Sequence, residues 1–324
     1  MPPAERYGRS THSAGPYNPG TPPPPRFPRR QFRLAVAVGA LFLAFGALAR
    51  AQDGQLARAE AAVEKTIAAS GADVGVYLRS LDGRTEWSFG AEQAFHAAST
   101  MKVPVMIELF HQVQQGQLTL EDTLEIKNEF HSIVDGSVYK LSADDDSESD
   151  LYKAEGQTRT LGQLCDAMIT VSSNLATNLL IEKLGVQNIR ATVRGLGAVG
   201  MNVLRGVEDG KAFAKGLNNT TTARGLGILL EAIAEGKAVD GASSRKMIVI
   251  LERQKFNDGI PAGLPPGLRV AHKTGEITKI HHDAAIVFAE RPYVLVILVR
   301  GLAEEKASAE LIADISRQLY AATQ

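Results

Sequence analysis

The sequence predicts an α/β (α+β) protein in which both ends of the chain build one sheet and the middle forms a helical lobe. Short β-rich runs lie near the start of the folded region, at 74–88, and return near the end, at 269–299. Between them, apolar residues repeat mainly at helical spacing. A cleft between the sheet and the helical lobe is the expected place for a functional site.

Composition and charge exclude several classes of protein. The chain has 324 residues, of which 44% are hydrophobic and 22% charged, which is enough for a substantial core in one or two domains. A formal net charge of −1 argues against nucleic-acid binding. Cys165 is the single cysteine, and its apolar neighbours predict a buried structural thiol. We expect no cofactor and no metal, and we interpret His281-His282-Asp283 as a strand end.

Residues 1–51 are predicted to be a disordered N-terminus followed by an export signal. Residues 1–28 are rich in proline and glycine, and are either disordered or upstream sequence from an early start site. Arginines then precede an uncharged run over 34–49, and a small-x-small cleavage site ends at Ala51. The pattern predicts a periplasmic or secreted protein with no stable membrane insertion after cleavage, against the alternative of a retained anchor. The pair Arg29-Arg30 leaves both the Sec and the twin-arginine route open.

The region after the signal begins with a helix and a hairpin. An Ala/Glu-rich helix is predicted over 55–70, followed by strands at 74–81 and 85–88 that Asp82-Gly83 joins. A buried helix then begins at about Ser99, because apolar residues continue from there at helical spacing.

The segment 126–160 is expected to be irregular and long enough to cover the rim of a pocket. It contains the acidic run 144–150. Such a run could hold a hard cation, but the glycine and the spacing of a calcium loop are absent. We therefore interpret it as a solvated loop.

The second half of the chain passes from helices to strands. Helical segments are predicted over 161–184, 190–204, 220–235 and 243–253, β-rich runs at 269–273, 284–289 and 293–299, and a closing helix at 303–322. We therefore assign residues 52–324 to one folded domain. Its sheet lobe comes from about 54–95 and 265–324, and its helical lobe from about 96–264.

Ser99 and Lys102 stand three positions apart at the start of the apolar helical pattern. Positions i and i+3 are neighbours on one helix face, so the Lys102 amine can reach the Ser99 hydroxyl. An amine of lowered pKa can remove the serine proton, which makes Ser99 a candidate acylation site. Two further copies of serine-x-x-lysine, in polar surroundings, occur at Ser137/Lys140 and Ser243/Lys246.

Two more motifs follow in an informative order. Ser172-Ser173-Asn174 lies at a helix break, and Lys273-Thr274-Gly275 closes a strand. The order Ser-x-x-Lys, Ser-x-Asn, Lys-Thr-Gly is that of the penicillin-recognising serine enzymes. From about residue 54 to 322 the chain therefore resembles the class A serine β-lactamase family. The resemblance implies a β-lactamase/transpeptidase-like fold, with a five-stranded antiparallel sheet flanked by helices beside an all-helical domain.

The resemblance also implies catalytic roles. Ser99 attacks the substrate carbonyl, with Lys102 as the base or as an electrostatic partner to one. The backbone N–H groups of Ser99 and Glu276 form the oxyanion hole. Ser172 passes a proton to the departing nitrogen, and Lys273 supplies positive potential.

Substrate contacts are assigned to three further positions of the same motifs. Thr274 is expected to hydrogen-bond the substrate carboxylate and Asn174 its amide side chain, beside Gly275. The expected partner is a small-molecule β-lactam or the D-Ala-D-Ala peptide that it mimics. We expect the protein to be a monomer.

The sequence leaves open how an acyl-enzyme is released. Class A enzymes use a glutamate in an Ω-shaped loop, closely followed by Leu-Asn, to activate the deacylating water. Glu208 lies at nearly the family spacing after Ser172 and is the candidate base, but it does not begin the pattern Glu-x-x-Leu-Asn, and it could equally be a structural or exposed carboxylate. Ser173 also stands where the family usually has aspartate. Glu276 stands where a small residue is usual, so its carboxylate would repel anionic substrates if it faced the cleft.

We therefore interpret the chain as an exported serine hydrolase that acts on β-lactams through an acyl-enzyme. Two alternatives remain open. One is a D,D-peptidase-like or esterase-like hydrolase that penicillin acylates and that releases it slowly. The other is a non-catalytic protein that binds cell-wall peptides.

Overall fold

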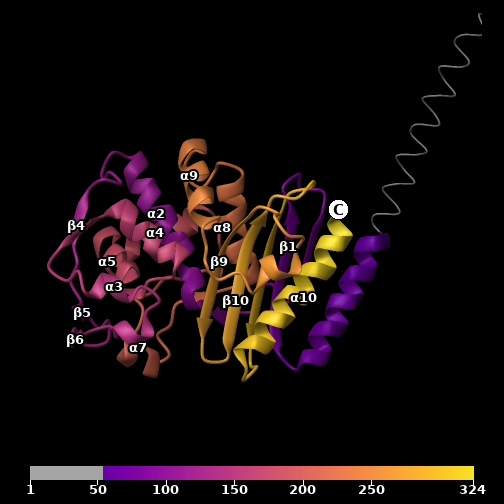
Figure 1. Ribbon diagram of the computed structural model, residues 1–324, viewed down its shortest axis with the longest axis horizontal. Helices are drawn as coiled ribbons and strands as arrows, with labels where there is room; N and C mark the ends of the chain where they lie inside the picture. Colours follow the sequence, from indigo (N-terminus) through magenta and orange to yellow (C-terminus); the bar gives the residue numbers. More distant parts are fainter. Residues whose placement is uncertain (1–53) are drawn as a thin grey trace, which may run out of the picture. The chain divides into compact units, whose positions relative to one another are not determined.

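The structure, a computed structural model, describes residues 54–324 (Figure 1). The predicted N-terminal disordered segment and export signal lie outside the described residues. Within 54–324, no helix combines the length and the apolar composition needed to cross a membrane.

A five-stranded antiparallel sheet forms the centre of the larger lobe, as predicted. Its strand order is β2-β1-β11-β10-β9, so the first and last parts of the chain pair directly. The strands are β1 (Asp73–Ser80), β2 (Glu86–Phe89), β9 (Val270–Ile277), β10 (Ile280–Val287) and β11 (Tyr293–Arg300). His281, His282 and Asp283 are the second to fourth residues of β10, which therefore begins four residues before the run predicted at 284–289.

The central strand β11 shows why the sheet has a core on each face. Its residues are apolar from Tyr293 to Val299 and all are buried. Because successive side chains point to opposite faces, Leu295 and Ile297 pack into one hydrophobic cluster, and Val294 and Val296 pack into the other. Apolar residues without polar alternation are expected for a strand that is covered on both sides.

Helices cover both faces of the sheet. The helix over residues 54–70 and α10 (Glu305–Thr323) lie side by side on one face (Figure 1). On the other face, α8 (Ala223–Ala234) packs against β1, and the Tyr77 hydroxyl donates a 2.7 Å hydrogen bond to Glu231 of α8. Helix α8 falls in the segment assigned by sequence to the helical lobe, yet it packs directly on the sheet.

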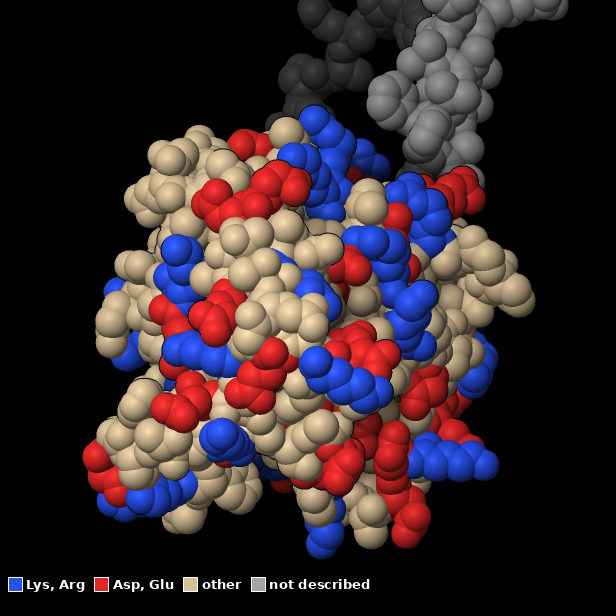
Figure 2. Space-filling view, turned by 60° about the vertical axis from the view of Figure 1, so that its left-hand side comes forward, with Lys and Arg blue, Asp and Glu red and all other residues tan. Residues whose placement is uncertain are grey.

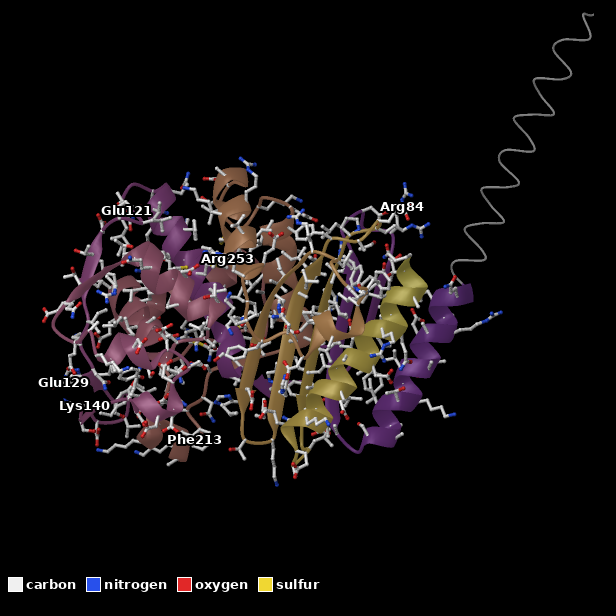
Figure 3. All side chains as sticks on the ribbon, in the orientation of Figure 1. Arg84, Glu121, Glu129, Lys140, Phe213 and Arg253 are labelled. Atoms are coloured by element: carbon white, nitrogen blue, oxygen red, sulfur yellow. The ribbon has the colours of Figure 1, made fainter. Side chains whose placement is uncertain are left out.

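The helical lobe packs around α2, which is buried along most of its length. Its main helices are α2 (Lys102–Gln114), α4 (Leu161–Thr170), α5 (Asn174–Leu184), α6 (Val186–Gly195) and α9 (Gly241–Leu251). Thr160 and Gln163 form a capping box that begins α4. Arg253, after α9, pairs with Asp166 of α4 (Figure 3). Cys165 is buried as predicted, and burial raises the pKa of its thiol to about 12.

The remaining elements are short. Three two-stranded ladders pair β3 (Phe95–His96) with β8 (Thr220–Thr221), β4 (Thr123–Glu125) with β7 (Thr158–Thr160), and β5 (Phe130–His131) with β6 (Val138–Tyr139). The short helices are η1 (Ala98–Met101), η2 (Ala143–Asp145), α3 (Ser149–Tyr152), α7 (Gly210–Ala214) and η3 (Ile260–Gly263). The segment 126–160, expected to be irregular, thus contains paired strands and helical turns.

Gly227 allows α8 to approach the sheet. A Cβ atom at this position would lie 2.2 Å from Cδ1 of Tyr77, whose ring is buried and tied to α8. We expect Gly227→Ala to lower the free energy of unfolding by about 1–3 kcal/mol, because the ring has no room to move.

Gly195→Ala is the matched control, since a Cβ atom there meets no heavy atom within 4 Å. Urea denaturation should show this control unchanged or more stable by up to about 1 kcal/mol. Equal midpoints for the two variants would contradict the proposed steric limit at Gly227.

Candidate active site

The three sequence motifs meet at one cavity. It has a volume of about 270 Å³, and its lining includes Ser99, Ser172, Asn174, Thr274, Gly275 and Glu276. The remaining lining residues are Asp145, Ser147, Phe256, Asp258, His281 and Glu305. A larger cavity of about 950 Å³ lies beside α4 and α9, and none of the motif residues lines it.

Ser99 lies on the 3₁₀ turn η1, one turn before the position where α2 begins. The edge strand β9 lies against this turn because Gly275 has no side chain. A Cβ atom at 275 would be 2.9 Å from the backbone nitrogen of Thr100 and 3.0 Å from that of Ser99. This close approach brings the backbone that follows Lys273-Thr274 beside the candidate nucleophile.

The Lys102 amine is fully buried and is held by the second motif. It donates hydrogen bonds to the Ser172 carbonyl oxygen at 2.6 Å, the Ser172 hydroxyl at 3.1 Å and Oδ1 of Asn174 at 2.9 Å. In the described part of the chain, no hydrogen bond joins this amine to the Ser99 hydroxyl, which was the contact suggested by their spacing. Burial lowers the pKa of Lys102 to about 7, although Asp146 and Glu208 oppose the shift.

The Ser172 hydroxyl lies between two lysine amines. Lys273 is also fully buried, and its amine donates to the Ser172 hydroxyl at 3.1 Å and to the Thr274 carbonyl at 2.8 Å. Burial, and then repulsion from Lys102, lower the pKa of Lys273 well below its usual value. Because a hydroxyl oxygen can accept two hydrogen bonds, the Ser172 proton remains available to a third group.

Backbone strain is concentrated around this cavity. Four residues other than glycine have positive φ within 54–324, and three belong to the site: Ala98 (+44°), Ser172 (+61°) and Glu208 (+60°). The left-handed region is costly for residues with a Cβ atom, so tertiary contacts have to hold these positions. The fourth, Lys279, lies in the turn between β9 and β10.

Asp146 holds the Ser172-Ser173-Asn174 segment in place. Its Oδ2 accepts hydrogen bonds from the backbone nitrogens of Asn174 and Leu175, both at 2.9 Å, and from the Ser173 hydroxyl at 3.3 Å. Asp146 is only 8% exposed, so the interpretation of the whole acidic run as a solvated loop is wrong at this position. A carboxylate from another loop thus supports the motif in which Ser173 replaces the usual aspartate.

The loop that carries Glu208 is anchored on both sides. The Val207 backbone nitrogen donates to Oδ1 of Asn178 at 2.7 Å, and its carbonyl accepts from Nδ2 of the same side chain at 3.1 Å. On the other side, the buried Asp209 accepts from the Ser132 hydroxyl at 2.9 Å and the Ile133 nitrogen at 3.0 Å. Glu208 is thereby held between two fixed neighbours.

Glu208 contacts the second motif directly. Its Oε1 accepts a 2.6 Å hydrogen bond from Nδ2 of Asn174, and Oδ1 of the same amide accepts from Lys102. The residue borders solvent, but its carboxyl end is crowded by site groups, and this burial raises its pKa despite the bond from Asn174. The structure therefore joins Glu208 to Lys102 through one amide.

Four exposed carboxylates line the cavity, whereas the two amines are buried and bond to the Ser172 hydroxyl that lines it. The carboxylates belong to Asp145, Asp258, Glu276 and Glu305. Partial burial and then the nearby Glu305 raise the pKa of Glu276 to about 7. Elsewhere, acidic and basic side chains are interspersed on the face shown in Figure 2.

Sequence reasoning missed several residues that shape this site. Asp146, Asp209 and Glu305 come from loops or a helix end where acidic residues are common, so no local pattern singles them out. Asn178 follows the second motif and could have been selected because a buried amide one helix turn from Asn174 needs partners.

A family model described as the β-lactamase enzyme family matches residues 58–323. The chain belongs to this family. Among curated relatives, β-lactamase PSE-4 of Pseudomonas aeruginosa is 24% identical over 243 residues, which cover 74% of this chain and 80% of that protein. β-Lactamase CARB-3 of the same species is 24% identical over 63% of this chain and 67% of that protein.

Solved structures agree with this membership of the β-lactamase family. A β-lactamase from Sphaerobacter thermophilus DSM 20745 has a TM-score of 0.71 and 26% identity, covering 83% of this chain and 97% of its own. PBP-A has a TM-score of 0.68 and 26% identity, and the match covers 83% of this chain and 95% of PBP-A. The resemblance to class A β-lactamases and the predicted fold are confirmed, and the chain is a serine hydrolase of that type.

Removal of the Asp146 carboxylate should release the Ser172–Asn174 segment. We expect Asp146→Ala to lower the free energy of unfolding by about 2–3 kcal/mol, because buried N–H groups of Asn174 and Leu175 lose a charged acceptor. Urea denaturation measures the change.

Asp144→Ala is the control, since this neighbouring aspartate is exposed and should change stability by less than about 0.5 kcal/mol. If both variants unfold at the same urea concentration, Asp146 does not support the motif in solution.

Proposed function

We propose that this β-lactamase family member hydrolyses β-lactams through an acyl-enzyme on Ser99. One observation carries the proposal: two fully buried amines converge on the Ser172 hydroxyl in the cavity that Ser99 lines. An amine that is neutral near pH 7 can act as a base toward one serine while a second serine serves as a proton donor.

In the proposed acylation step, the Ser99 oxygen attacks the lactam carbonyl and its proton passes to the Lys102 amine. The developing oxyanion is bound by the backbone N–H groups of Ser99 and Glu276. The carbon–nitrogen bond then breaks, and the nitrogen takes the Ser172 proton. Lys102 then returns the proton that it took from Ser99 to the Ser172 oxygen, which its amine already contacts.

The proposed substrate contacts come from the second and third motifs. Lys273 supplies positive potential, and Thr274 donates a hydrogen bond to the carboxylate of the β-lactam. The Asn174 amide is assigned to the amide side chain of the substrate, beside Gly275. These positions line the same cavity or, for Lys273, bond to a residue that does.

Deacylation is assigned to Glu208, acting as the base for a water molecule. The 2.6 Å bond from Asn174 and the anchored neighbours support this role, because they direct the carboxylate toward the motif residues. The water adds to the ester carbonyl and Glu208 takes its proton. That proton then passes to the Ser99 oxygen as it leaves, so Glu208 ends the cycle as a carboxylate and Lys102 as a neutral amine.

A second candidate is a penicillin-binding hydrolase that deacylates slowly. It is favoured by the neighbour PBP-A, of which a mutant is described as an acyl-enzyme complex with penicillin G, at 26% identity and a TM-score of 0.68. The absence of the pattern Glu-x-x-Leu-Asn at Glu208 also favours it. A receptor for cell-wall peptides is the third possibility, in which Ser99 forms no covalent bond.

We also propose that the protein is exported to the periplasm or secreted, with cleavage near Ala51, and acts as a monomer. The basic, apolar and small-residue order of the N-terminal sequence supports export. The export signal is proposed from sequence alone.

Hydrolysis of a chromogenic cephalosporin and labelling by a fluorescent penicillin test these assignments together. We expect turnover and transient label in the unmodified chain, and neither in Ser99→Ala. Glu208→Gln should keep the label for longer and lower turnover by about a hundredfold or more, because general-base assistance is lost.

Glu129→Gln, an exposed carboxylate near β5 (Figure 3), is the matched control and should behave like the unmodified chain. Persistent label without turnover in the unmodified chain would assign the slow hydrolase, and absence of label would assign the receptor. Unchanged turnover in Glu208→Gln would eliminate this residue as the base.

The acylation rate should fall below neutral pH, because the proposed base, Lys102, has a pKa of about 7 and acts only when neutral. The neutral fraction implies a rate about five-fold lower at pH 6 than at pH 7, with little change above pH 8. Stopped-flow labelling by a fluorescent penicillin measures the profile. A rate that stays constant from pH 8 to pH 6 would contradict the role of Lys102 as base.

A further inference from the structure

We propose that Glu276, His281 and Glu305 form a binding site for a divalent transition-metal cation such as Zn²⁺ at the rim of the Ser99 cavity. One ring nitrogen of His281 and one carboxylate oxygen from each glutamate all lie within 4.8 Å of one another. All three residues line the cavity.

The fold itself brings these three side chains together. Glu276 on β9 and His281 on β10 are direct partners across the antiparallel pair, so their side chains share one face of the sheet. Glu305 is the first residue of α10, the helix that covers that face. Two strands and a helix therefore fix the three groups.

His281 provides an independent sign of a ligand. Its side chain is only 4% exposed, and its Nδ1 atom is buried without a hydrogen-bond partner among the described residues. A buried ring nitrogen without a partner costs free energy that a hydrogen bond or a metal ion can recover. Glu276, across the strand pair, and Glu305, at the start of α10, supply negative charge that would balance a bound cation.

The donor set fits zinc better than magnesium or calcium. Zinc binds imidazole nitrogen and carboxylate oxygen at about 2.0–2.2 Å, which places tetrahedral ligand atoms about 3.3–3.5 Å apart. Both glutamates are exposed and can rotate inward to close the remaining gap. Three protein ligands leave a fourth position for water or for a ligand atom from the cavity.

A bound cation would also change the charge at the cavity entrance. Without metal, the carboxylates of Glu276 and Glu305 repel an anionic ligand, whereas a divalent cation cancels both charges. Faster acylation by penicillin in the presence of zinc follows from this step, which rests on the proposed function.

Isothermal titration of the untagged chain with ZnCl₂, together with the visible spectrum of the Co²⁺ form, tests the site. We expect one Zn²⁺ per chain and a rise in melting temperature. His281→Gln and Glu305→Gln should each weaken binding by well over tenfold, since loss of an outer partner alone costs about 10–100-fold.

Glu304→Gln, at the exposed position beside Glu305, is the matched control and should bind zinc like the unmodified chain. Circular dichroism shows whether the buried His281→Gln variant is folded, and the exposed Glu305→Gln tests the site if it is not. No zinc binding, or equal binding by Glu305→Gln and Glu304→Gln, would overturn the proposal. The closeness of the Glu276 and Glu305 carboxylates would then be explained by a proton that they share.

The second arm measures penicillin labelling with and without ZnCl₂. Zinc should accelerate labelling in the unmodified chain but not in Glu305→Gln. Zinc binding without this acceleration would refute the proposed effect of the metal on penicillin acylation, but not the metal site itself. Absence of label at every zinc concentration would refute the proposed acylation and leave the metal site standing.

Discussion

The burial of two lysine amines against one serine hydroxyl is the constraint on which the site depends. Lys102 and Lys273 are both fully buried, and their hydrogen-bond acceptors are all uncharged oxygens. Two ammonium groups in such a place would be costly, so desolvation favours the neutral amine. The Ser172 hydroxyl is the one acceptor that the two amines share.

This arrangement requires a rigid frame, and the surrounding contacts supply it. Ser172 and Glu208 both have positive φ, so each would relax if its loop were free. Asp146 holds the backbone after Ser172, and Asn178 with Asp209 holds the backbone on either side of Glu208. The free energy stored in these loops is thus balanced by buried hydrogen bonds from segments distant in sequence.

The motifs carried most of the predictable information. Hydrophobic periodicity located the strands and helices, and the motif order implied the β-lactamase-like fold. The first two motifs lie at helix starts, whereas Lys273-Thr274-Gly275 lies inside β9 rather than closing a strand as expected. The spacing suggested a bond between Lys102 and Ser99, but the 3₁₀ turn at Ser99 changes how these two side chains lie relative to an α-helix. The bond from Lys102 to Ser172 joins residues 70 positions apart, so no local spacing predicts it. Asp146 and His281 depend on tertiary neighbours, and no local pattern distinguishes such residues.

The basic and acidic groups of the site lie in different places and act on different steps. The buried amines bond to Ser172, and their protonation governs proton transfer, while the exposed Glu276 and Glu305 line the cavity. These carboxylates therefore repel a monoanionic ligand at entry and act mainly on its association rate, whereas the amines act on the chemistry. A glutamate at 276 is compatible with the same catalytic groups as a small residue, because the preceding Gly275 lies against the Ser99 backbone while the Glu276 side chain lies near His281 and Glu305. Selectivity can thus change at the rim without any change in the groups that perform the reaction.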